Sequence, residues 1–568
     1  MHLIPHRVPP TTTRAAIAVC ICRAFDGGAR WENTARKAGR GGAARANARE
    51  LAASRAVPPL GVHRPLASHP AIPSGHVSPA TPTRRLGLAV LAALVVAVAA
   101  GCGSEKETSA DPAAVVPARA PVYVEATIPP PGATRDDALA AARKVLGTAD
   151  AGARLQELIR GKGGKGDVAP WIGDRVGAFS LTGSTADGAY VAAASDVGAA
   201  RDWVSGQGGR TQRYENVDIR IGAGGTAYAV VADRVVVGSP AAVRATVDAA
   251  GGDDLASLTA FKESLERVEG DDGVGRGYLA LRALLEGRTA PASGGMLGSL
   301  ATGLATGSMP TAVGMRFHAD GSAVRADLAG VGGADLGPRP DPAFVAGLTG
   351  KAWLAMGLGQ VGERLKEQLG GSGPILALVG AQAGLDVDKE ILGWMGEGAM
   401  FVTGDSPATI GGALIVRSKD PAAMRAAIPK LGSLIARFAA GSSARELHTT
   451  GVDAGIAVRA QGVPAPVEIA AAGDRFVIAV GHDALREAIA PTSRLGDDPD
   501  FRSAAATLGD GLKPTMFIGA HEATPLASVL AARTGADVRE VREVLGRFTA
   551  AVAADRGDRR WRASIGLR

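Results

Sequence analysis

The segments PWIGDRVGAFSL (170–181) and GWMGEGAMFVTG (393–404) share a pattern that decides the fold. Each contains a tryptophan followed two residues later by a glycine, and each continues into a run of small and apolar residues that includes a phenylalanine. A short apolar run bounded by glycine predicts a buried strand. Because the same pattern occurs twice in one chain, we expect an internal repeat.

Other segments recur in the same order around the two tryptophan segments. Each match joins a strand-like or helix-like pattern in the first half to the same kind of pattern in the second half. The matched pairs are PVYVEAT (121–127) with KAWLAMG (351–357), AYVAAASDVGAARDWV (189–204) with ALIVRSKDPAAMRAAI (413–428), ENVDIRI (215–221) with TGVDAGI (450–456), ADRVVVGSPAAVRATV (232–247) with GDRFVIAVGHDALREAI (473–489), LTAFKESLERV (258–268) with DPDFRSAAATL (498–508), and GYLALRAL (277–284) with MFIGAHEA (516–523). The ordered matches predict two homologous repeats.

The repeats have the signature of the α+β class. Strand-like segments joined by short Gly/Asp turns predict antiparallel pairing, and helical segments between them predict helices packed on one face of each sheet. Asp196 and Asp420 each stand directly before a helical segment, where aspartate caps a helix. We therefore expect one repeat at 121–330 and a second at 351–568, joined by a Gly/Pro-rich linker at 331–350.

A secretory signal precedes the first repeat. Arg84 and Arg85 stand before an apolar run that ends in Ala-Ala-Gly-Cys at Cys102, the arrangement of a bacterial lipoprotein signal. The run is shorter than the roughly 20 apolar residues that a membrane span requires. We expect cleavage before Cys102 and lipidation of its thiol, which would anchor the protein on the extracytoplasmic face of the cell membrane.

Two segments around the signal are predicted to lack a folded core. Residues 1–83 are rich in Arg, Ala and Pro without hydrophobic periodicity, so we expect either a misassigned start, with translation beginning near Val77, or a disordered extension. Residues 103–120 are small, polar and Pro-containing, and we expect a flexible tether there.

Net charge argues against nucleic acid as a partner. The whole chain carries +6, but residues 1–101 hold 13 of its 62 Lys and Arg and 3 of its 56 Asp and Glu. The remainder therefore holds 49 basic and 53 acidic residues, a balance of −4, and it has no basic stripe interleaved with aromatics. Cys20 and Cys22 precede the signal, so the expected mature protein has no thiol besides Cys102 and can form neither a disulfide nor a zinc–thiolate site.

No catalytic constellation is visible after Cys102. The four histidines are not at metal-ligand spacing, and we predict no metal, cofactor or catalytic residue; they are His318, His448, His482 and His521. The triplet Gly404-Asp405-Ser406 is similar to an esterase motif, but a hairpin turn explains it better. The pairs Asp233-Arg234 and Asp474-Arg475 are expected in turns, with the arginines solvated.

The tether, the opening P-V-Y-V strand, the W-(I/M)-G-(D/E) motif and the D-R-x-(V/F)-V strand resemble the bacterial family called domain of unknown function 3352. The resemblance spans about 121–568 and implies a structural similarity without an assigned activity. From the lipid anchor, the missing catalytic constellation and the duplicated sheets, we expect a non-catalytic envelope lipoprotein that binds a hydrophobic ligand or an envelope protein. An exported hydrolase with a carboxylate pair and a structural scaffold of the envelope are the alternatives.

Overall fold

A computed structural model describes most of the chain from residue 110 onward. The described ranges are 110–128, 134–160, 164–222, 224–268, 270, 273–286, 310–333, 339–369, 385–406, 409–438, 443–459, 465–481, 483–520, 527 and 537–568. These residues all belong to one compact unit. The expected signal at 84–102, Cys102 and the segment 1–83 lie outside the described residues. Within these ranges, no helix has the length and apolar character needed to cross a membrane.

Within the described ranges, twenty strands form one sheet, and every pairing between neighbouring strands is antiparallel. The strands of the first half are β1 (Val122–Thr127), β2 (Ile172–Ser180), β3 (Gly188–Ala194), β4 (Arg210–Tyr214), β5 (Val217–Ile221), β6 (Ala227–Val231), β7 (Arg234–Gly238), β8 (Gly275–Leu279), β9 (Ala312–Ala319) and β10 (Ala323–Val331). Those of the second half are β11 (Leu354–Gln360), β12 (Met395–Thr403), β13 (Gly411–Ser418), β14 (Ser443–Glu446), β15 (Ala454–Arg459), β16 (Val467–Ala472), β17 (Arg475–Val480), β18 (Met516–Gly519), β19 (Phe548–Gly557) and β20 (Arg560–Leu567). The predicted α+β class with antiparallel sheet is confirmed.

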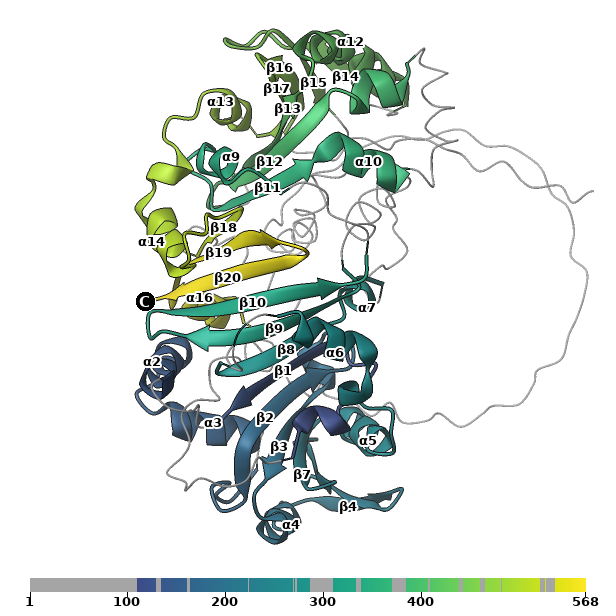
Figure 1. The fold of residues 1–568 in the computed structure, drawn as a ribbon, viewed down its shortest axis with the longest axis vertical. Coiled ribbons are helices and arrows are strands. Elements are labelled where there is room, and N and C mark those ends of the chain that lie inside the picture. Colours follow the sequence, from purple (N-terminus) through teal and green to yellow (C-terminus); the bar gives the residue numbers. More distant parts are fainter. Residues whose placement is uncertain are drawn as a thin grey trace, which may run out of the picture. The chain divides into compact units, whose positions relative to one another are not determined.

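The strand order is the same in both halves. The pairings run β4-β5-β6-β7-β3-β2-β1-β8-β9-β10 in the first half and β14-β15-β16-β17-β13-β12-β11-β18-β19-β20 in the second. The final strands of the two halves, β10 and β20, pair with each other and join the halves into one sheet (Figure 1). We call this pairing the junction.

Short helices connect the strands. The first half contains η2 (Pro112–Val115), α2 (Thr134–Leu146), α3 (Ala151–Arg160), η3 (Thr185–Asp187), α4 (Val197–Ser205), α5 (Pro240–Ala249), η4 (Leu255–Ser257), α6 (Thr259–Glu266) and α7 (Leu281–Glu286). The second half contains α9 (Pro342–Ala346), α10 (Val361–Leu369), the π-helix η6 (Val387–Leu392), α12 (Pro421–Phe438), α13 (Ala484–Ile489), η7 (Leu495–Asp497), α14 (Pro499–Thr507) and α16 (Val538–Leu545). The predicted caps are present, since Asp196 accepts from the Ala199 N–H and Asp420 from the Ala423 N–H.

Helices cover both faces of the sheet, so the prediction of one covered face is wrong. Val124 packs in a cluster with Ala141 of α2, whereas its neighbour Tyr123 packs in another cluster with Phe261 of α6. Successive residues of a strand point to opposite faces, so the two helices lie on opposite sides. The second half has the same arrangement, with separate clusters around α14 and α12. The reason is composition, because strands such as β7 are buried along nearly their whole length and need cover on both sides.

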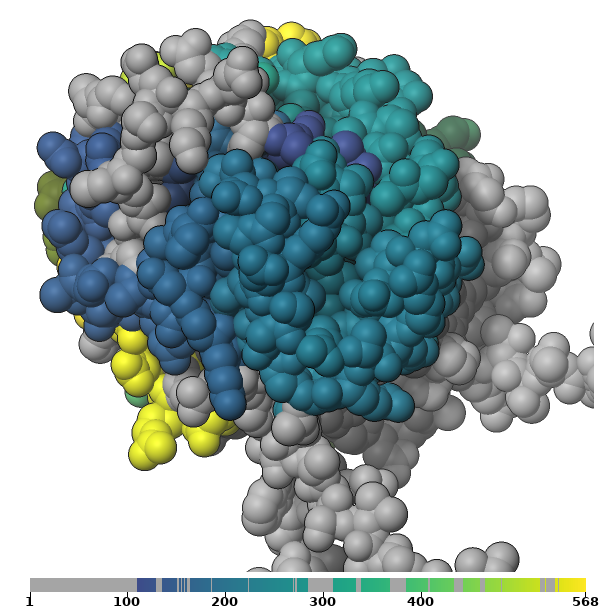
Figure 2. Space-filling model, turned by 90° about the horizontal axis from the view of Figure 1, so that it is seen from below, coloured from purple at the N-terminus to yellow at the C-terminus, as the bar shows by residue number. Residues whose placement is uncertain are grey.

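The segments expected to be a tether and a linker partly belong to the fold. Asp111 caps η2 and Asp341 caps α9, and each is followed by Pro-Ala. Val116 and Val345 are fully buried. Figure 2 shows the purple atoms of the first described segment as a small patch set among teal and blue atoms. Residues 111–120 and 339–350 are therefore folded, because each carries an apolar cluster that packs against the sheet.

Candidate functional site

A line of charged residues crosses the middle of the sheet. Glu125 of β1 lies opposite Arg276 of β8, which lies opposite Arg316 of β9. Arg316 lies opposite Asp327 of β10, which lies opposite Arg562 of β20. Residues directly opposite each other in adjacent strands project from the same face. We call these five residues the charged row; it ends at the junction.

Glu125, at one end of the charged row, is a buried carboxylate held by two arginines. Its side chain is 3% exposed, and it accepts from Arg175 Nε at 2.7 Å and from Arg276 Nη2 at 3.0 Å. The Tyr123 hydroxyl also donates to it, and burial together with the Glu125 charge raises the pKa of Tyr123. This end of the charged row is therefore fully hydrogen-bonded, as a buried charge requires.

Asp111 brings the η2 segment to the same arginines. It accepts from Arg276 Nη2 at 2.7 Å and lies 3.3 Å from Arg175 Nη2. Burial alone would raise the pKa of Asp111, but the two arginines outweigh it and the pKa lies below its usual value. The Asp111 contacts hold the η2 segment against the sheet.

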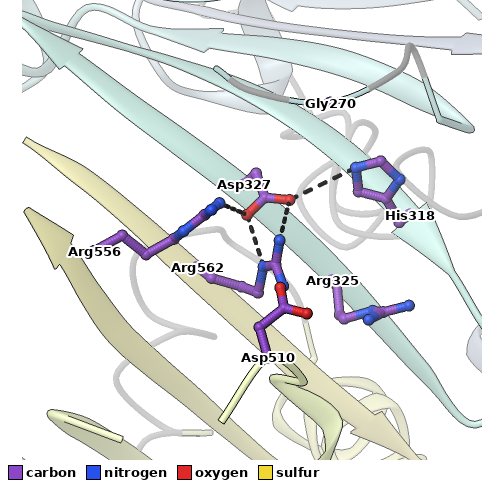
Figure 3. A pocket seen from close by; sticks show the side chains of 7 residues that line it. All are labelled: Gly270, His318, Arg325, Asp327, Asp510, Arg556 and Arg562. Carbon is purple, nitrogen blue, oxygen red and sulfur yellow. Dashed lines mark hydrogen bonds and ion pairs between the residues drawn. The ribbon is translucent and has the colours of Figure 1, made fainter. Parts of the chain in front are cut away.

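Asp327, near the other end, is a buried carboxylate that collects three basic side chains (Figure 3). Its oxygens accept from Arg562 Nε at 2.7 Å and Nη2 at 3.1 Å, and from Arg556 Nη1 at 3.1 Å. His318 Nε2 lies 3.7 Å away. The two arginines come from β19 and β20 and His318 from β9, so Asp327 links the two halves across the junction.

Asp327 forms part of the wall of a cavity of about 380 Å³. We call it the junction cavity; it is lined by Gly270, His318, Arg325, Asp327, Asp510, Arg556 and Arg562. In Figure 3 the side chains come from both halves, with Asp510 contributed by the loop after α14. Three arginines face two aspartates here, so the lining carries a positive balance when His318 is neutral.

The surroundings of His318 favour its neutral form. Burial is the main cause that lowers its pKa, and the nearby Arg325, Arg562 and Arg316 lower it further. Asp327 acts in the opposite direction without reversing the shift. A neutral imidazole carries one donor and one acceptor nitrogen, so His318 can hydrogen-bond a ligand in the junction cavity without adding charge.

A second cavity, of about 290 Å³, lies beneath α6, next to Arg276 and Arg316 of the charged row. Its lining is Asp111, Ala256, Phe261, Lys262, Leu265, Glu266, Arg276 and Arg316. Gly314 allows α6 to come this close to β9, because a Cβ there would lie 2.5 Å from the Ser264 carbonyl carbon. The charged row thus runs from this cavity to the junction cavity.

Beyond the junction the charges stop. Arg562 lies opposite Ala554 of β19. The line then continues through Thr515, just before β18, and Gly357 of β11. Two backbone bonds place them there, since the Thr515 N–H donates to the Ala553 carbonyl and the Gly357 N–H donates to the Thr515 carbonyl. The same sheet is therefore built in the second half with small or uncharged residues in the places where the first half carries Arg316, Arg276 and Glu125.

The structure separates the residues considered in the sequence. His318 lies in the junction cavity, whereas the His448 side chain is 81% exposed beside Glu446. His482, His521 and Cys102 lie outside the described residues. Asp405 and Ser406 lie between β12 and β13 and bond to Thr409, which confirms the turn. In the described ranges, no group of three His, Cys, Asp or Glu side chains could hold a metal ion.

The expectation of solvated arginines in the two Asp-Arg turns is wrong. Arg234 is 9% exposed, and its Nε donates to the Asp111 carbonyl at 2.8 Å. Arg475 Nη1 donates to the Ala488 carbonyl at 3.1 Å, at the end of α13. Each arginine follows the turn rather than forming its tip, so its side chain points back onto the fold and donates to backbone carbonyls of neighbouring segments.

No family model and no curated protein matches the sequence. Two solved structures have some likeness, crystal forms I and IV of TP0453, at 11% and 10% identity. Each match covers 66% of this chain, with 93% and 94% of the other chain, and the TM-score is 0.19 in both cases. This score supports no comparison of fold or function.

Proposed function

We propose that the chain is a lipid-anchored envelope protein without catalytic activity, which binds a polar ligand or an envelope partner through the junction cavity. The main support for this proposal is the hydrogen bonding of the Asp327 carboxylate. Both of its oxygens accept from Arg562, and one also accepts from Arg556. A carboxylate bonded in this way organises basic side chains around a space, which suits recognition.

The same observation disfavours the alternative of a carboxylate hydrolase. Such an enzyme needs one carboxyl group that can hold a proton and a second that faces the reacting atom. Asp327 and Asp510 both accept hydrogen bonds from Arg562, so each carboxylate is engaged with an arginine and neither is free to face a reacting atom. We therefore prefer binding over hydrolysis, and a charged or polar ligand over the hydrophobic one considered first.

We further propose that the two halves are homologous repeats that arose by duplication. Support comes from the identical strand order and from aromatic pairs at matched points. Phe261 and Tyr278 stack edge to face with centroids 5.6 Å apart, and Phe501 and Phe517 do so at 5.4 Å. The two Asp-Pro-Ala caps at Asp111 and Asp341 add a third correspondence.

Replacement of Cys102 by Ala tests the anchor. In the native host, wild-type protein is expected in the membrane fraction and the Cys102→Ala protein in the soluble extracytoplasmic fraction, because a diacyl anchor supplies the membrane affinity. A variant with Ala at Cys20 and Cys22 is the matched control and is expected to stay with the membrane. Full retention of the Cys102→Ala protein in the membrane would refute the anchor.

A further inference from the structure

We propose that the junction cavity binds a phosphate group, and that its oxygens replace the Asp510 carboxylate on Arg562 and bond to Arg325 and His318. The inference rests on the proposed binding function and gives it a ligand class. In the absence of ligand, the Asp510 carboxylate accepts the Arg562 hydrogen bond that a phosphate oxygen would accept in the complex.

Asp510 is suited to leave. Its side chain is 69% exposed although it pairs with the well-covered Arg562, whose side chain is 13% exposed. It lies at the tip of the loop Gly509-Asp510-Gly511, in which all three residues have positive φ, at +67°, +54° and +67°. Non-glycine residues adopt this conformation only at a cost. The partner of Arg562 is thus a surface carboxylate on a tight loop, which an incoming anion can displace.

Asp327 fixes the positions of two other side chains of the junction cavity, Arg562 and Arg556. Its two oxygens fix Arg562 and Arg556 from one side. Arg325 has weaker bonding in the described structure, with Asp320 at 3.9 Å and a buried Nε that has no partner. A guanidinium has five N–H donors, so Arg325 has donor capacity left for a ligand. The fixed arginines lose little freedom when an anion binds.

A phosphate fits the arrangement better than a planar carboxylate. The donors come from three strands, with His318 on β9, Arg325 on β10 and Arg562 on β20, and they surround a space of about 380 Å³. A tetrahedral phosphate accepts hydrogen bonds from several directions, and arginine is the side chain that pairs with it most effectively. Once Asp510 is displaced, three arginines face the single carboxylate of Asp327, so a second negative charge on the ligand is attracted by the arginines more than it is repelled by Asp327.

The uncharged line Ala554, Thr515 and Gly357 in the second half indicates that charged residues are not required at these positions to form strands. Thr515 and Gly357 occupy the matching line there, and the sheet continues without interruption. A buried line of charge costs desolvation energy. Binding of an anion would explain why the charged row is present in one half and absent from the matching line of the other.

Calorimetric titration of the full chain in detergent with inorganic phosphate tests the proposal. Wild-type protein is expected to bind one phosphate. Arg325→Gln should weaken binding about tenfold, because it removes a charge-assisted hydrogen bond. Asp510→Asn should strengthen binding about threefold, because it removes the competing carboxylate while asparagine tolerates positive φ.

The exposed pair Arg213–Asp218, at 3.1 Å with side chains 62% and 61% exposed, supplies controls of matched charge. Arg213→Gln and Asp218→Asn are expected to change the affinity less than about twofold. Absence of phosphate binding by both wild-type and Asp510→Asn protein would overturn the proposal. Equal effects of the control and cavity variants would also overturn it, since they would show a response to net charge alone. Asp510→Asn keeps the test valid if Arg325→Gln fails to fold.

A vesicle assay separates the two sources of phosphate. Full-length Cys102→Ala protein is mixed with phosphatidylcholine vesicles that contain or lack phosphatidic acid. Binding to the acidic vesicles that Arg325→Gln removes assigns a lipid headgroup, whereas binding of free phosphate without vesicle binding assigns a soluble ligand. Both outcomes support the site. Because calorimetry does not depend on lipidation, loss of the anchor and loss of phosphate binding are distinguishable results.

Discussion

The two halves use the same strand order but distribute buried charge differently. In the first half Glu125, Arg276 and Arg316 lead across the sheet toward Asp327 at the junction. On the other side of the junction the line continues through Ala554 and uncharged residues. The second half therefore serves as an internal control, and it shows that this type of sheet does not depend on charged residues in its middle.

The second half has a buried carboxylate of its own, in a different place. Glu487 of α13 is 2% exposed and accepts from Lys351 Nζ and Thr349 Oγ1, each at 2.7 Å. The matching segment of the first half, AAVRATV at 241–247, contains no acidic residue. Glu487 ties a helix to the segment before β11, which is a contact within one half. The charged row instead reaches the boundary between halves.

The largest expected effect comes from removing the carboxylate at the junction. Asp327→Asn should destabilise the protein by about 4 kcal/mol, because Arg562 and Arg556 then lie against a neutral group in a partly buried site. The change in the free energy of unfolding is measured by denaturant titration followed by circular dichroism.

A double variant sharpens this comparison between halves. Asp327→Thr with Arg562→Thr removes one charge of each sign and imitates the uncharged line of the second half. We expect it to cost about 2 kcal/mol, less than Asp327→Asn alone, since the buried charge no longer lacks its partner. A double variant that costs as much as the single one would mean that the first half needs its charges to form the sheet.

An intermediate effect is expected for Glu487 and depends on pH. Burial opposes ionisation of Glu487, but bonds from Lys351, Thr349 and Thr492 lower its pKa from 4.5 to about 2. A lowered pKa stabilises the folded state fully above the unfolded value, near pH 4.5, and the contribution disappears as the pH falls toward 2. Glu487→Gln should therefore cost about 3 kcal/mol at pH 6 and about 1 kcal/mol at pH 3.

Urea titrations at the two pH values measure this difference. Glu446→Gln is the control, because its side chain is 77% exposed and should show no such change with pH. A Glu487→Gln cost that is equal at pH 3 and pH 6 would contradict the assigned role of this carboxylate.

The smallest expected effect compares the two Asp-Pro-Ala caps. Asp111 and Asp341 each accept a bond from the backbone N–H two residues later, at 2.9 Å. Asp111 also bonds Arg276 at 2.7 Å, whereas Asp341 lies 3.5 Å from Arg417. We expect Asp341→Ala to cost about 1 kcal/mol and Asp111→Ala about 2 kcal/mol, as judged from thermal denaturation. Equal costs would show that Arg276 adds nothing to the cap.

Much of the fold could be predicted from the sequence because it depends on local patterns. The apolar runs around Trp171 and Trp394 gave buried strands, and both tryptophans lie in the core. Asp196 and Asp420 marked helix starts correctly. The prediction of one covered face failed because alternation is weak in strands such as β7, where buried valines occupy both faces. The order of the strands in the sheet could not be predicted from local sequence patterns, because it depends on contacts between segments that are distant in the chain.

The candidate site was missed, although its residues carry a visible signal. Charged residues interrupt strands of small and apolar residues at Glu125, Arg276 and Asp327, and a charge in such a place is costly unless it is paired. This signal indicates buried ion pairs. It does not indicate which strands lie side by side, and the register that brings Asp327 opposite Arg562 appears only in the folded sheet. The repeated Asp-Pro-Ala at 111–113 and 341–343 was a further sequence signal for where each half begins.

The register at the junction also determines what each half can recognise. In the first half Tyr278 lies opposite Gly314, which lies opposite Ala329. In the second half Phe517 lies opposite Val552, which lies opposite Ser564. Asp327 and Arg562 stand two residues before Ala329 and Ser564, so they occupy matching positions in the two halves. Two identical halves joined in this register would bring the residue at this one position against its own copy, which means aspartate against aspartate or arginine against arginine. The opposite charges reject such like-with-like partners. The Asp327–Arg562 pair therefore favours pairing of the first half with the second half over pairing of two like halves.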